Sequence, residues 1–501
     1  MQNLFKILSL SCCSVNLFAL SVVADQQNDK PNVVFIVADD HGYADMSCLP
    51  FAAKDVQTPN LDRLAKRGIT FTQGYSASPI CSPARLSLMT GRYPQPQNGF
   101  WYGVKGLPNR NETDGLTIAE LLKNEGYATG MVGKVHYGGG EGNLRNRSFP
   151  LNHGFDYFFG FSGSPMGRKH YLIHSDNAEK KFQESIKHSP LKKPGKYTLR
   201  MESMLDGKKR INIKGFSTEL FGARAREFVR KNAAKPFFLN LSFNAIHDFT
   251  NQLPKEYLKK HGIEPYPDWD PAKEPIRAWT KKFYNPNLPQ GRSFYLGQLY
   301  YMDKEIGKLL DELKKLDILE NTIIVYLSDN GGATNMYANN APLNGGKFTV
   351  YEGGLRIPFI VAYPKKFRKE IIDDTVISSL DLFPTICALT GISAEKLPTI
   401  LDGKDLTPLL SGTDTATSHK TLFWDMGFSY AVRDGNWKLK VTTRTPSEDY
   451  AIPNEKGTFL YNLASDPGEL ENLAEDRPEV MKKLQLLHEK WRENNFSMTE
   501  K

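Results

Sequence analysis

Three short apolar runs, each followed by polar side chains, most constrain how this chain folds. The runs cover residues 31–38, 235–243 and 322–328. The polar side chains that follow them are Asp39, Asp40, His247, Asp329 and Asn330. Continuous apolar runs rich in branched residues are typical of strands that are buried on both faces of a parallel sheet. Such sheets bind ligands beyond the carboxyl ends of their strands, so we expect chemistry to gather at these residues.

Amphipathic helical patterns accompany these runs and indicate the fold class. They cover residues 116–124, 218–232 and 293–316. Alternation of strands and helices predicts an α/β fold, in which a mostly parallel sheet is flanked by helices. We expect this large domain to extend from residue 25 to residue 415.

The pattern changes after about residue 415. Short strand-like runs cover residues 421–424, 430–433 and 437–441, and a helical pattern covers residues 478–494. These patterns predict a small C-terminal α+β subdomain, residues 416–501, with an antiparallel sheet and one terminal helix.

The first residues have the pattern of a targeting segment. Lys6 precedes an apolar run over residues 7–23 that ends in small residues suited to cleavage. The run is short and is broken by polar residues, and no second apolar stretch of about 20 residues follows, which argues against stable membrane insertion. We therefore predict a signal peptide, residues 1–24, and export to the periplasm or the extracellular space. Lipoprotein anchoring through Cys12 or Cys13 is the less favoured alternative.

The charge of the chain narrows the class of partner only slightly. Loss of the leader lowers the formal net charge from +8 to +7, because it removes one lysine and no acidic residue. A basic exported protein attracts polyanions. Sulfated polymers, nucleic acids and anionic membranes fit this charge equally well.

Three cysteines remain after the leader, Cys48, Cys81 and Cys387. Three are too few for a disulfide framework. A single bridge between Cys48 and Cys387 and a pair of buried free thiols both stay open as alternatives.

Two segments have the character of insertions around a substrate site. Residues 166–214 contain 13 Lys or Arg against 5 Asp or Glu, and residues 248–292 combine prolines with aromatic side chains. Basic loops could hold anionic groups of a ligand, and aromatic faces could stack on its rings. Loops that merely cover the body of the protein fit equally well. The substrate-binding candidates are Arg168, His170, Trp269 and Trp279.

The sharpest chemical signal spans residues 81–92 and reads CSPARLSLMTGR. Pro83 suits the first turn of a helix, so Cys81 would lie at the positive helix N-terminus, where an oxyanion is stabilised. The segment resembles the signature of type I sulfatases, in which the cysteine of a Cys-x-Pro-x-Arg core is converted to formylglycine. Ala84 stands where the family usually has serine.

Other segments are similar to the same family, in the same order. They are Asp39-Asp40-His41-Gly42-Tyr43, Gly133-Lys134-Val135-His136, Asp329-Asn330-Gly331-Gly332 and Gly345-Gly346-Lys347. Three carboxylates and an amide oxygen are hard ligands, which favour calcium or magnesium over zinc. Residues 460–473 also resemble sulfatase endings, so the resemblance covers nearly the whole mature chain.

The resemblance implies an alkaline-phosphatase-like fold and a defined set of site residues. One calcium ion would be held by Asp39, Asp40, the modified Cys81, Asp329 and Asn330. The other catalytic residues would be Arg85, Lys134, His136, His247 and Lys347. A formylglycine-generating enzyme or an anaerobic sulfatase-maturating enzyme would oxidise Cys81.

The resemblance also implies a mechanism. The hydrate of formylglycine offers two hydroxyl groups, of which one attacks sulfur and the other drives expulsion of sulfate. Arg85 and His136 would orient the hydrate, with His136 as the base for the elimination step and Asp329 as the partner that activates attack. Lys134, Lys347 and His247 would hold the sulfate, and His247 would protonate the departing sugar oxygen.

Several functions remain open at this point. Phosphonate or phosphate ester hydrolysis by the same superfamily is one alternative, and a non-catalytic glycan-binding relative is another. Export and basicity favour a sulfated polysaccharide or oligosaccharide as partner, with algal galactans such as carrageenan preferred over glycosaminoglycans. We expect no nucleic-acid partner.

Overall fold

The computed structural model describes most of the chain between Lys30 and Phe496. The described residues are 30–97, 99–100, 106–107, 115–138, 143–161, 204–211, 213, 215–247, 253–266, 278, 282, 287–413, 419–444 and 454–496. The predicted signal peptide lies outside them, as do the substrate-binding candidates Arg168, His170, Trp269 and Trp279.

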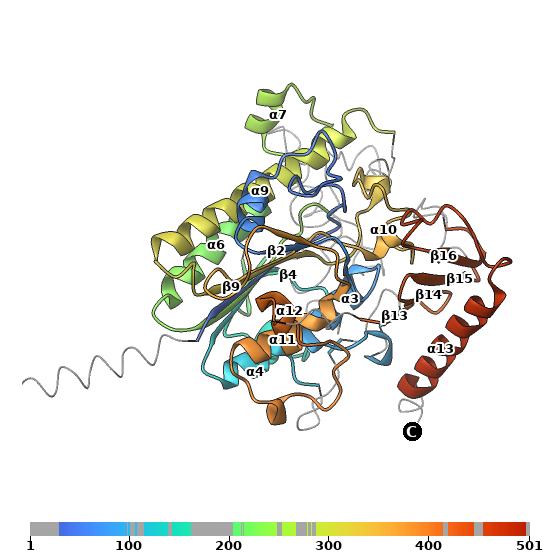
Figure 1. Ribbon diagram of the computed structural model, residues 1–501. Helices are drawn as coiled ribbons and strands as arrows, with labels where there is room; N and C mark the ends of the chain where they lie inside the picture. Colours follow the sequence, from blue (N-terminus) through green and yellow to red (C-terminus); the bar gives the residue numbers. More distant parts are fainter. Residues whose placement is uncertain are drawn as a thin grey trace, which may run out of the picture.

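A ten-stranded sheet forms the centre of the large domain (Figure 1). In spatial order its strands are β11 (Ile371–Asp373), β2 (Ile69–Phe71), β10 (Phe359–Ala362), β9 (Thr322–Ser328), β1 (Asn32–Ala38), β8 (Phe237–Ser242), β4 (Ala128–Lys134), β5 (Tyr157–Phe161), β6 (Met204–Asp206) and β7 (Lys209–Ile211). The five strands from β9 to β5 are parallel to one another. Antiparallel pairs occur around β10 and along β5, β6 and β7. The predicted mostly parallel sheet is confirmed.

The central strand β1 explains why both faces of the sheet are covered. Its side chains alternate between two hydrophobic cores, with Val33, Phe35 and Val37 in one core and Val34 and Ile36 in the other. All five are at most 1% exposed. A strand that is buried on both faces needs an apolar layer on each side, which accounts for its continuous apolar run.

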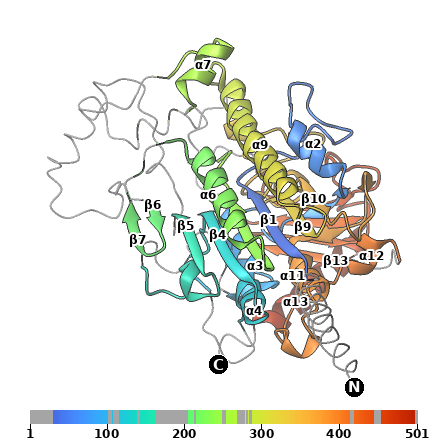
Figure 2. The ribbon, with the colours of Figure 1, turned by 90° about the vertical axis from the view of Figure 1, so that its left-hand side faces the viewer.

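Helices supply these two layers (Figure 2). One layer contains α2 (Pro59–Ala65), α6 (Ser217–Asn232) and α9 (Gly291–Lys315). The other contains α3 (Cys81–Thr90), α4 (Ile118–Asn124), α11 (Leu382–Leu389) and α12 (Thr407–Ser411). In the long helix α9, Leu299, Met302, Ile306, Leu309 and Leu313 recur at helical spacing and are buried.

The C-terminal sheet has four antiparallel strands in chain order, and a single helix packs on it (Figure 1). The strands are β13 (Thr421–Asp425), β14 (Ser429–Asp434), β15 (Trp437–Thr442) and β16 (Gly457–Asn462), and the helix is α13 (Pro478–Phe496). The predicted antiparallel sheet with one terminal helix is confirmed. The boundary near residue 415 stays a prediction.

Shorter elements connect these layers. They are β3 (Gly74–Tyr75), β12 (Ile377–Ser378), α7 (Lys255–His261), α10 (Glu352–Leu355) and the 3-10 turns at Gln95–Gln97, Pro150–Asn152, Thr334–Met336, Ser379–Asp381 and Ala394–Lys396. Across the described ranges, we find no helix that is long and apolar enough to cross a membrane.

The three described cysteines are free thiols. Cys48 packs against the core on the face of the sheet covered by α2, α6 and α9, whereas Cys387 lies in the core on the other face. Because the sheet separates them, Cys48 and Cys387 do not pair.

Candidate active site

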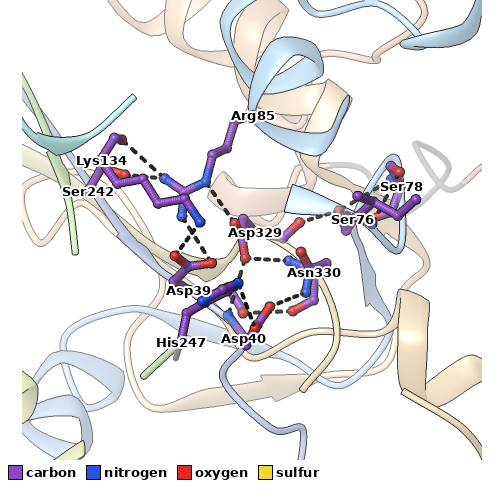
Figure 3. A network of polar contacts seen from close by, with 12 residues as sticks. Asp39, Asp40, Ser76, Ser78, Arg85, Lys134, Ser242, His247, Asp329 and Asn330 are labelled. Atoms are coloured by element: carbon purple, nitrogen blue, oxygen red, sulfur yellow. Dashed lines mark hydrogen bonds and ion pairs between the residues drawn. The ribbon is translucent and has the colours of Figure 1, made fainter. Parts of the chain in front are cut away.

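The carboxyl ends of β1 and β9 bring four polar residues of the site together (Figure 3). These are Asp39 and Asp40 after β1, and Asp329 and Asn330 after β9. The two strands are parallel, and their in-register pairing extends to Ala38. The backbone N–H of Asp329 donates to the carbonyl of Ala38 at 3.0 Å, and the N–H of Asp40 donates to Oδ1 of Asp329 at 3.3 Å. Strand pairing therefore places Asp39 and Asp40 beside Asp329 and Asn330.

Asp40 has a left-handed backbone conformation, with φ of 63°. This conformation is costly for most side chains but is tolerated by aspartate, and it is often found where function requires it. Oδ1 of Asp40 accepts a hydrogen bond from Nδ2 of Asn330 at 2.7 Å. Oδ2 lies 2.7 Å from Nζ of Lys347 and 3.6 Å from Nε2 of His247. Asp40 thus links the β9 pair to two basic side chains from separate loops.

The segment before His247 is fixed against β1 by backbone hydrogen bonds. The N–H of Asp39 donates to the carbonyl of Ala245 at 2.9 Å, and the N–H of Ile246 donates to the carbonyl of Asp39 at 2.8 Å. His247 therefore reaches the site from the end of β8, the neighbour of β1 in the sheet.

Lys134 and Arg85 also contact the aspartates. Lys134 is the last residue of β4 and is 0% exposed, and its Nζ lies 2.5 Å from Oδ2 of Asp39. Nε of Arg85 donates to Oδ2 of Asp329 at 2.7 Å, and its Nη2 lies 3.6 Å from Oδ1 of Asp39. Nη1 of Arg85 also donates to the hydroxyl of Ser242. Both basic side chains are therefore held in place by buried partners.

Cys81 is the first residue of α3 and is completely buried. Its Sγ lies within 4.8 Å of ligand atoms of Asp39 and His247. Burial raises the pKa of the Cys81 thiol to about 11, although Lys134 and Lys347 oppose this shift. The unmodified side chain is therefore a neutral thiol near pH 7.

His136 follows β4 with a left-handed φ of 53°. Burial lowers the pKa of its imidazole well below the ordinary value, and the positive charges of Lys134 and Arg85 lower it further. Its Nδ1 has no hydrogen-bond partner among the described residues. His136 is therefore a buried neutral imidazole.

The carboxylates have the character of a cation site. One oxygen from each of Asp39, Asp40 and Asp329 lies within 4.8 Å of the other two. Oδ1 of Asp39 and Oδ1 of Asn330 are buried and accept no hydrogen bond from any described residue. Unpaired buried oxygens are costly unless a ligand satisfies them. This set of hard oxygen donors fits one divalent cation such as calcium or magnesium.

The pKa values of Asp39 and Asp329 shift in opposite directions. For Asp39, burial opposes ionisation, but Lys134, His247 and Arg85 together keep its pKa well below the ordinary value. For Asp329, burial raises the pKa to about 6, although Arg85 acts in the opposite direction. Without a bound cation, Asp39 and Asp329 repel each other, and both depend on Lys134 and Arg85 for compensating positive charge.

The structure brings ten of the sequence-predicted site residues into one buried group, which we call the catalytic cluster. Its members are Asp39, Asp40, Cys81, Arg85, Lys134, His136, His247, Asp329, Asn330 and Lys347. Sequence reasoning missed Ser242, which contacts Arg85, and Ser76, whose hydroxyl donates to the carbonyl of Asp329 at 2.5 Å. Ser242 ends β8, and that position was its only signal.

Comparisons with known proteins agree with this geometry. The sulfatase family model matches residues 31–392, and a model for the C-terminal region of N-sulphoglucosamine sulphohydrolase matches residues 346–495. N-acetylgalactosamine-6-O-sulfatase of Bacteroides thetaiotaomicron is 27% identical, with 93% of each chain covered. Human arylsulfatase A is 30% identical, with 91% of this chain and 87% of the relative covered.

A solved structure supports the same assignment. The crystal structure of Ps i-CgsB in complex with k-i-k-neocarrahexaose is 28% identical, covers 92% of each chain and has a TM-score of 0.73. The family model alone spans well over half of the 501 residues. The chain therefore belongs to the sulfatase family of the alkaline-phosphatase-like superfamily, and it is a sulfuric ester hydrolase.

Proposed function

We propose that the protein is an exported enzyme that removes sulfate from a sulfated polysaccharide or oligosaccharide, using a formylglycine at position 81 and one calcium ion. The observation that carries this proposal is the position of Cys81, at the start of α3 and beside Asp39 and His247. We favour galactans of the carrageenan type, because the similar Ps i-CgsB is solved with neocarrahexaose. Sulfated N-acetylgalactosamine is the alternative, supported by the Bacteroides relative.

Modification of Cys81 makes chemical sense in this environment. Burial keeps the thiol protonated, and a thiol sulfur that accepted sulfate would release it poorly. A formylglycine-generating or anaerobic sulfatase-maturating enzyme would replace the thiol with an aldehyde. The hydrate of this aldehyde would have two hydroxyl groups, one to attack sulfur and one to drive release of sulfate. Asp329, whose pKa burial raises to about 6, would take the proton of the attacking hydroxyl.

Other residues of the catalytic cluster would bind calcium, orient the hydrate and accept its proton. Calcium, when bound to Asp39, Asp40, Asp329, Asn330 and residue 81, would supply positive charge next to the sulfate. Arg85 lies one turn along α3 from residue 81 and orients its hydrate. Its own position is fixed by the hydrogen bond of its Nε to Asp329. The neutral His136 accepts the proton of the hydrate as sulfate is released.

Two side chains beside Asp40 act on the substrate, one on the sulfate and one on the leaving sugar oxygen. Lys347 and His247 both face Oδ2 of Asp40, at 2.7 and 3.6 Å. From this position Lys347 holds a sulfate oxygen, and His247 protonates the sugar oxygen as the S–O bond breaks. General acid catalysis of this kind contributes roughly 10²- to 10⁴-fold.

The test is release of sulfate from defined substrates by the purified enzyme. The panel contains sulfated carrageenan oligosaccharides, sulfated N-acetylgalactosamine, a small aryl sulfate, a phosphate ester and a phosphonate ester. We expect sulfate release from a sulfated sugar and much weaker turnover of the phosphorus esters. Faster phosphonate or phosphate ester hydrolysis would contradict the proposal. The Cys81→Ala variant is the control for every substrate.

Export and the outer substrate contacts are separate parts of the proposal. Sequencing the N-terminus of the secreted protein tests cleavage after residue 24 and export to the periplasm or beyond. Alanine variants of Arg168, His170, Trp269 and Trp279 test whether these residues bind the sugar. We expect each to raise KM for oligosaccharides while leaving hydrolysis of a small aryl sulfate unchanged.

A further inference from the structure

A second buried group of charged side chains joins the C-terminal sheet to the large domain. We call it the anchor cluster, and its members are Tyr75, Glu352, Arg356, Arg433, Lys438 and Glu469. Each is at most 7% exposed. The proposed chemistry uses none of them, although burying so many charges is costly unless they are well paired.

Glu352 is the centre of the anchor cluster. Its Oε1 lies 2.8 Å from Nζ of Lys438, and its Oε2 accepts hydrogen bonds from the hydroxyl of Tyr75 at 2.5 Å and from Nε of Arg356. Its backbone N–H donates to Oε2 of Glu469 at 2.5 Å. Burial acts to raise the pKa of Glu352, but Lys438 and Arg356 keep it below the ordinary value. Glu352 is therefore an ionised, fully paired carboxylate.

Glu352 begins α10. Backbone hydrogen bonds join α10 to two segments of the catalytic cluster, the loop that carries Lys347 and the segment after Asn330. The N–H of Gly353 donates to the carbonyl of Asn344 at 2.7 Å, which closes the loop that carries Lys347. The N–H of Gly331, next to Asn330, donates to the carbonyl of Gly354 at 3.0 Å.

These segments pack so closely that neither Gly331 nor Gly354 has space for a side chain. A Cβ at Gly331 would lie 2.0 Å from the carbonyl oxygen of Gly353, and a Cβ at Gly354 would lie 2.1 Å from that of Thr349. Contacts this close are not possible without a shift of the backbone. The Lys347 loop, α10 and the segment after Asn330 are therefore in close backbone contact with one another.

Tyr75 provides a second connection. The next residue, Ser76, donates its hydroxyl to the carbonyl of Asp329 and its N–H to the carbonyl of Leu355 at 2.9 Å. The carbonyl of Ser76 accepts a hydrogen bond from Nε1 of Trp424, on β13, at 2.8 Å. The C-terminal sheet therefore holds the segment behind Asp329 as well as α10.

We propose that Lys438 and Glu352 are positioning residues, through which the C-terminal sheet sets the place of Lys347 in the active site. The inference rests on the role proposed above for Lys347. Among the described residues, the C-terminal sheet contributes no side chain to the catalytic cluster. It acts through the ion pair between β15 and α10.

The test combines two anchor variants with a matched control. Lys438→Met and Glu352→Gln remove a charge at nearly constant size, and we expect each to lower kcat/KM by about 10- to 100-fold. In a double-mutant cycle, adding Lys438→Met to Lys347→Ala should cause little further loss, because both changes remove the same interaction. Leu439→Ala is the control, since Leu439 lies between Lys438 and Lys440 on β15 but packs in the core with α13.

The control variant Leu439→Ala should lower Tm. Its effect on kcat/KM should be independent of Lys347, so the fold-losses of Leu439→Ala and Lys347→Ala should multiply in the double variant. The inference is overturned if both anchor variants keep wild-type kcat/KM, or if Lys438→Met also multiplies with Lys347→Ala. Full activity of Lys347→Ala alone would instead refute the proposed role of Lys347. Crystal structures of the anchor variants then decide the inference separately: we expect loss of the 2.7 Å contact between Lys347 and Asp40, and an unchanged contact would refute it.

Discussion

The catalytic cluster and the anchor cluster are both groups of buried charges, but they differ in how fully their polar atoms are paired. In the catalytic cluster, Oδ1 of Asp39 and Oδ1 of Asn330 lack hydrogen-bond partners among the described residues. In the anchor cluster, both carboxylate oxygens of Glu352 are bonded, to Lys438, Tyr75 and Arg356. Oε1 of Glu469 accepts no hydrogen bond from a described residue but forms an ion pair with Nζ of Lys438 at 2.8 Å. Close ion pairs stabilise a fixed junction, whereas oxygens that have neither a hydrogen bond nor a cation at hydrogen-bond distance are available to a bound cation and a substrate.

The largest effect should come from the reacting side chain itself. We expect Cys81→Ala to reduce kcat/KM by at least about 10⁴-fold, because it removes the nucleophile. Cys387→Ala is the matched control, since Cys387 is also a buried thiol but lies in an apolar core. It should keep full activity. Substantial turnover by Cys81→Ala would contradict the assignment of residue 81 as the nucleophile.

A smaller loss is expected when the proposed general acid is removed. His247→Gln should lower kcat/KM for a sulfated sugar by roughly 10²- to 10⁴-fold. The loss should be smaller for an aryl sulfate, whose leaving oxygen needs less protonation. His153→Gln is the control, because the buried His153 bonds to the hydroxyl of Tyr137 at 2.8 Å and lies outside the catalytic cluster. Equal losses for both substrates would argue against an acid role for His247.

Stability measurements distinguish the anchor cluster from ordinary surface charges. Glu352→Gln should lower the free energy of unfolding by about 3–5 kcal/mol, since it leaves buried Lys438 without its full partner. Lys483→Met should change it by less than about 1 kcal/mol, because the side chain of Lys483 is 60% exposed in its pair with Asp434. Urea unfolding of the two variants provides both values. Equal small changes would show that the buried cluster is not a rigid junction.

Calcium should act on the catalytic cluster through its unpaired oxygens. At a calcium concentration about 100 times its Kd, we expect stabilisation of the folded protein by about 2.7 kcal/mol. Asp40→Asn should lose most of this increment, and Lys483→Met should retain it. Thermal unfolding with calcium and with a chelator gives the comparison. A calcium-independent Tm for the wild-type protein would contradict the proposed cation site.

Much of the fold and of the catalytic cluster could be predicted from local patterns. The apolar runs before Asp39, His247 and Asp329 predict parallel strands, and parallel strands bring their carboxyl ends to one edge of the sheet. Pro83 predicts a helix with Cys81 at its N-terminus, and Cys81 is the first residue of α3. These features depend on residues that are close in sequence or on a general property of sheets.

The anchor cluster could not be predicted in this way. Lys438 and Lys440 alternate with apolar residues on β15, a pattern typical of a strand with one face in water, yet both are 0% exposed. Lys438 is buried because Glu352, 86 positions earlier, supplies its counter-charge. Such a pairing depends on how the C-terminal sheet packs against α10, and no local periodicity encodes it.

The measurement that tests the central claim most directly is the mass of the peptide that carries residue 81, taken from protein whose sulfate release has been measured. The proposed chemistry predicts an aldehyde in place of the thiol, and specific activity that rises in proportion to the modified fraction. A fully active preparation in which Cys81 remains an unmodified thiol would contradict it.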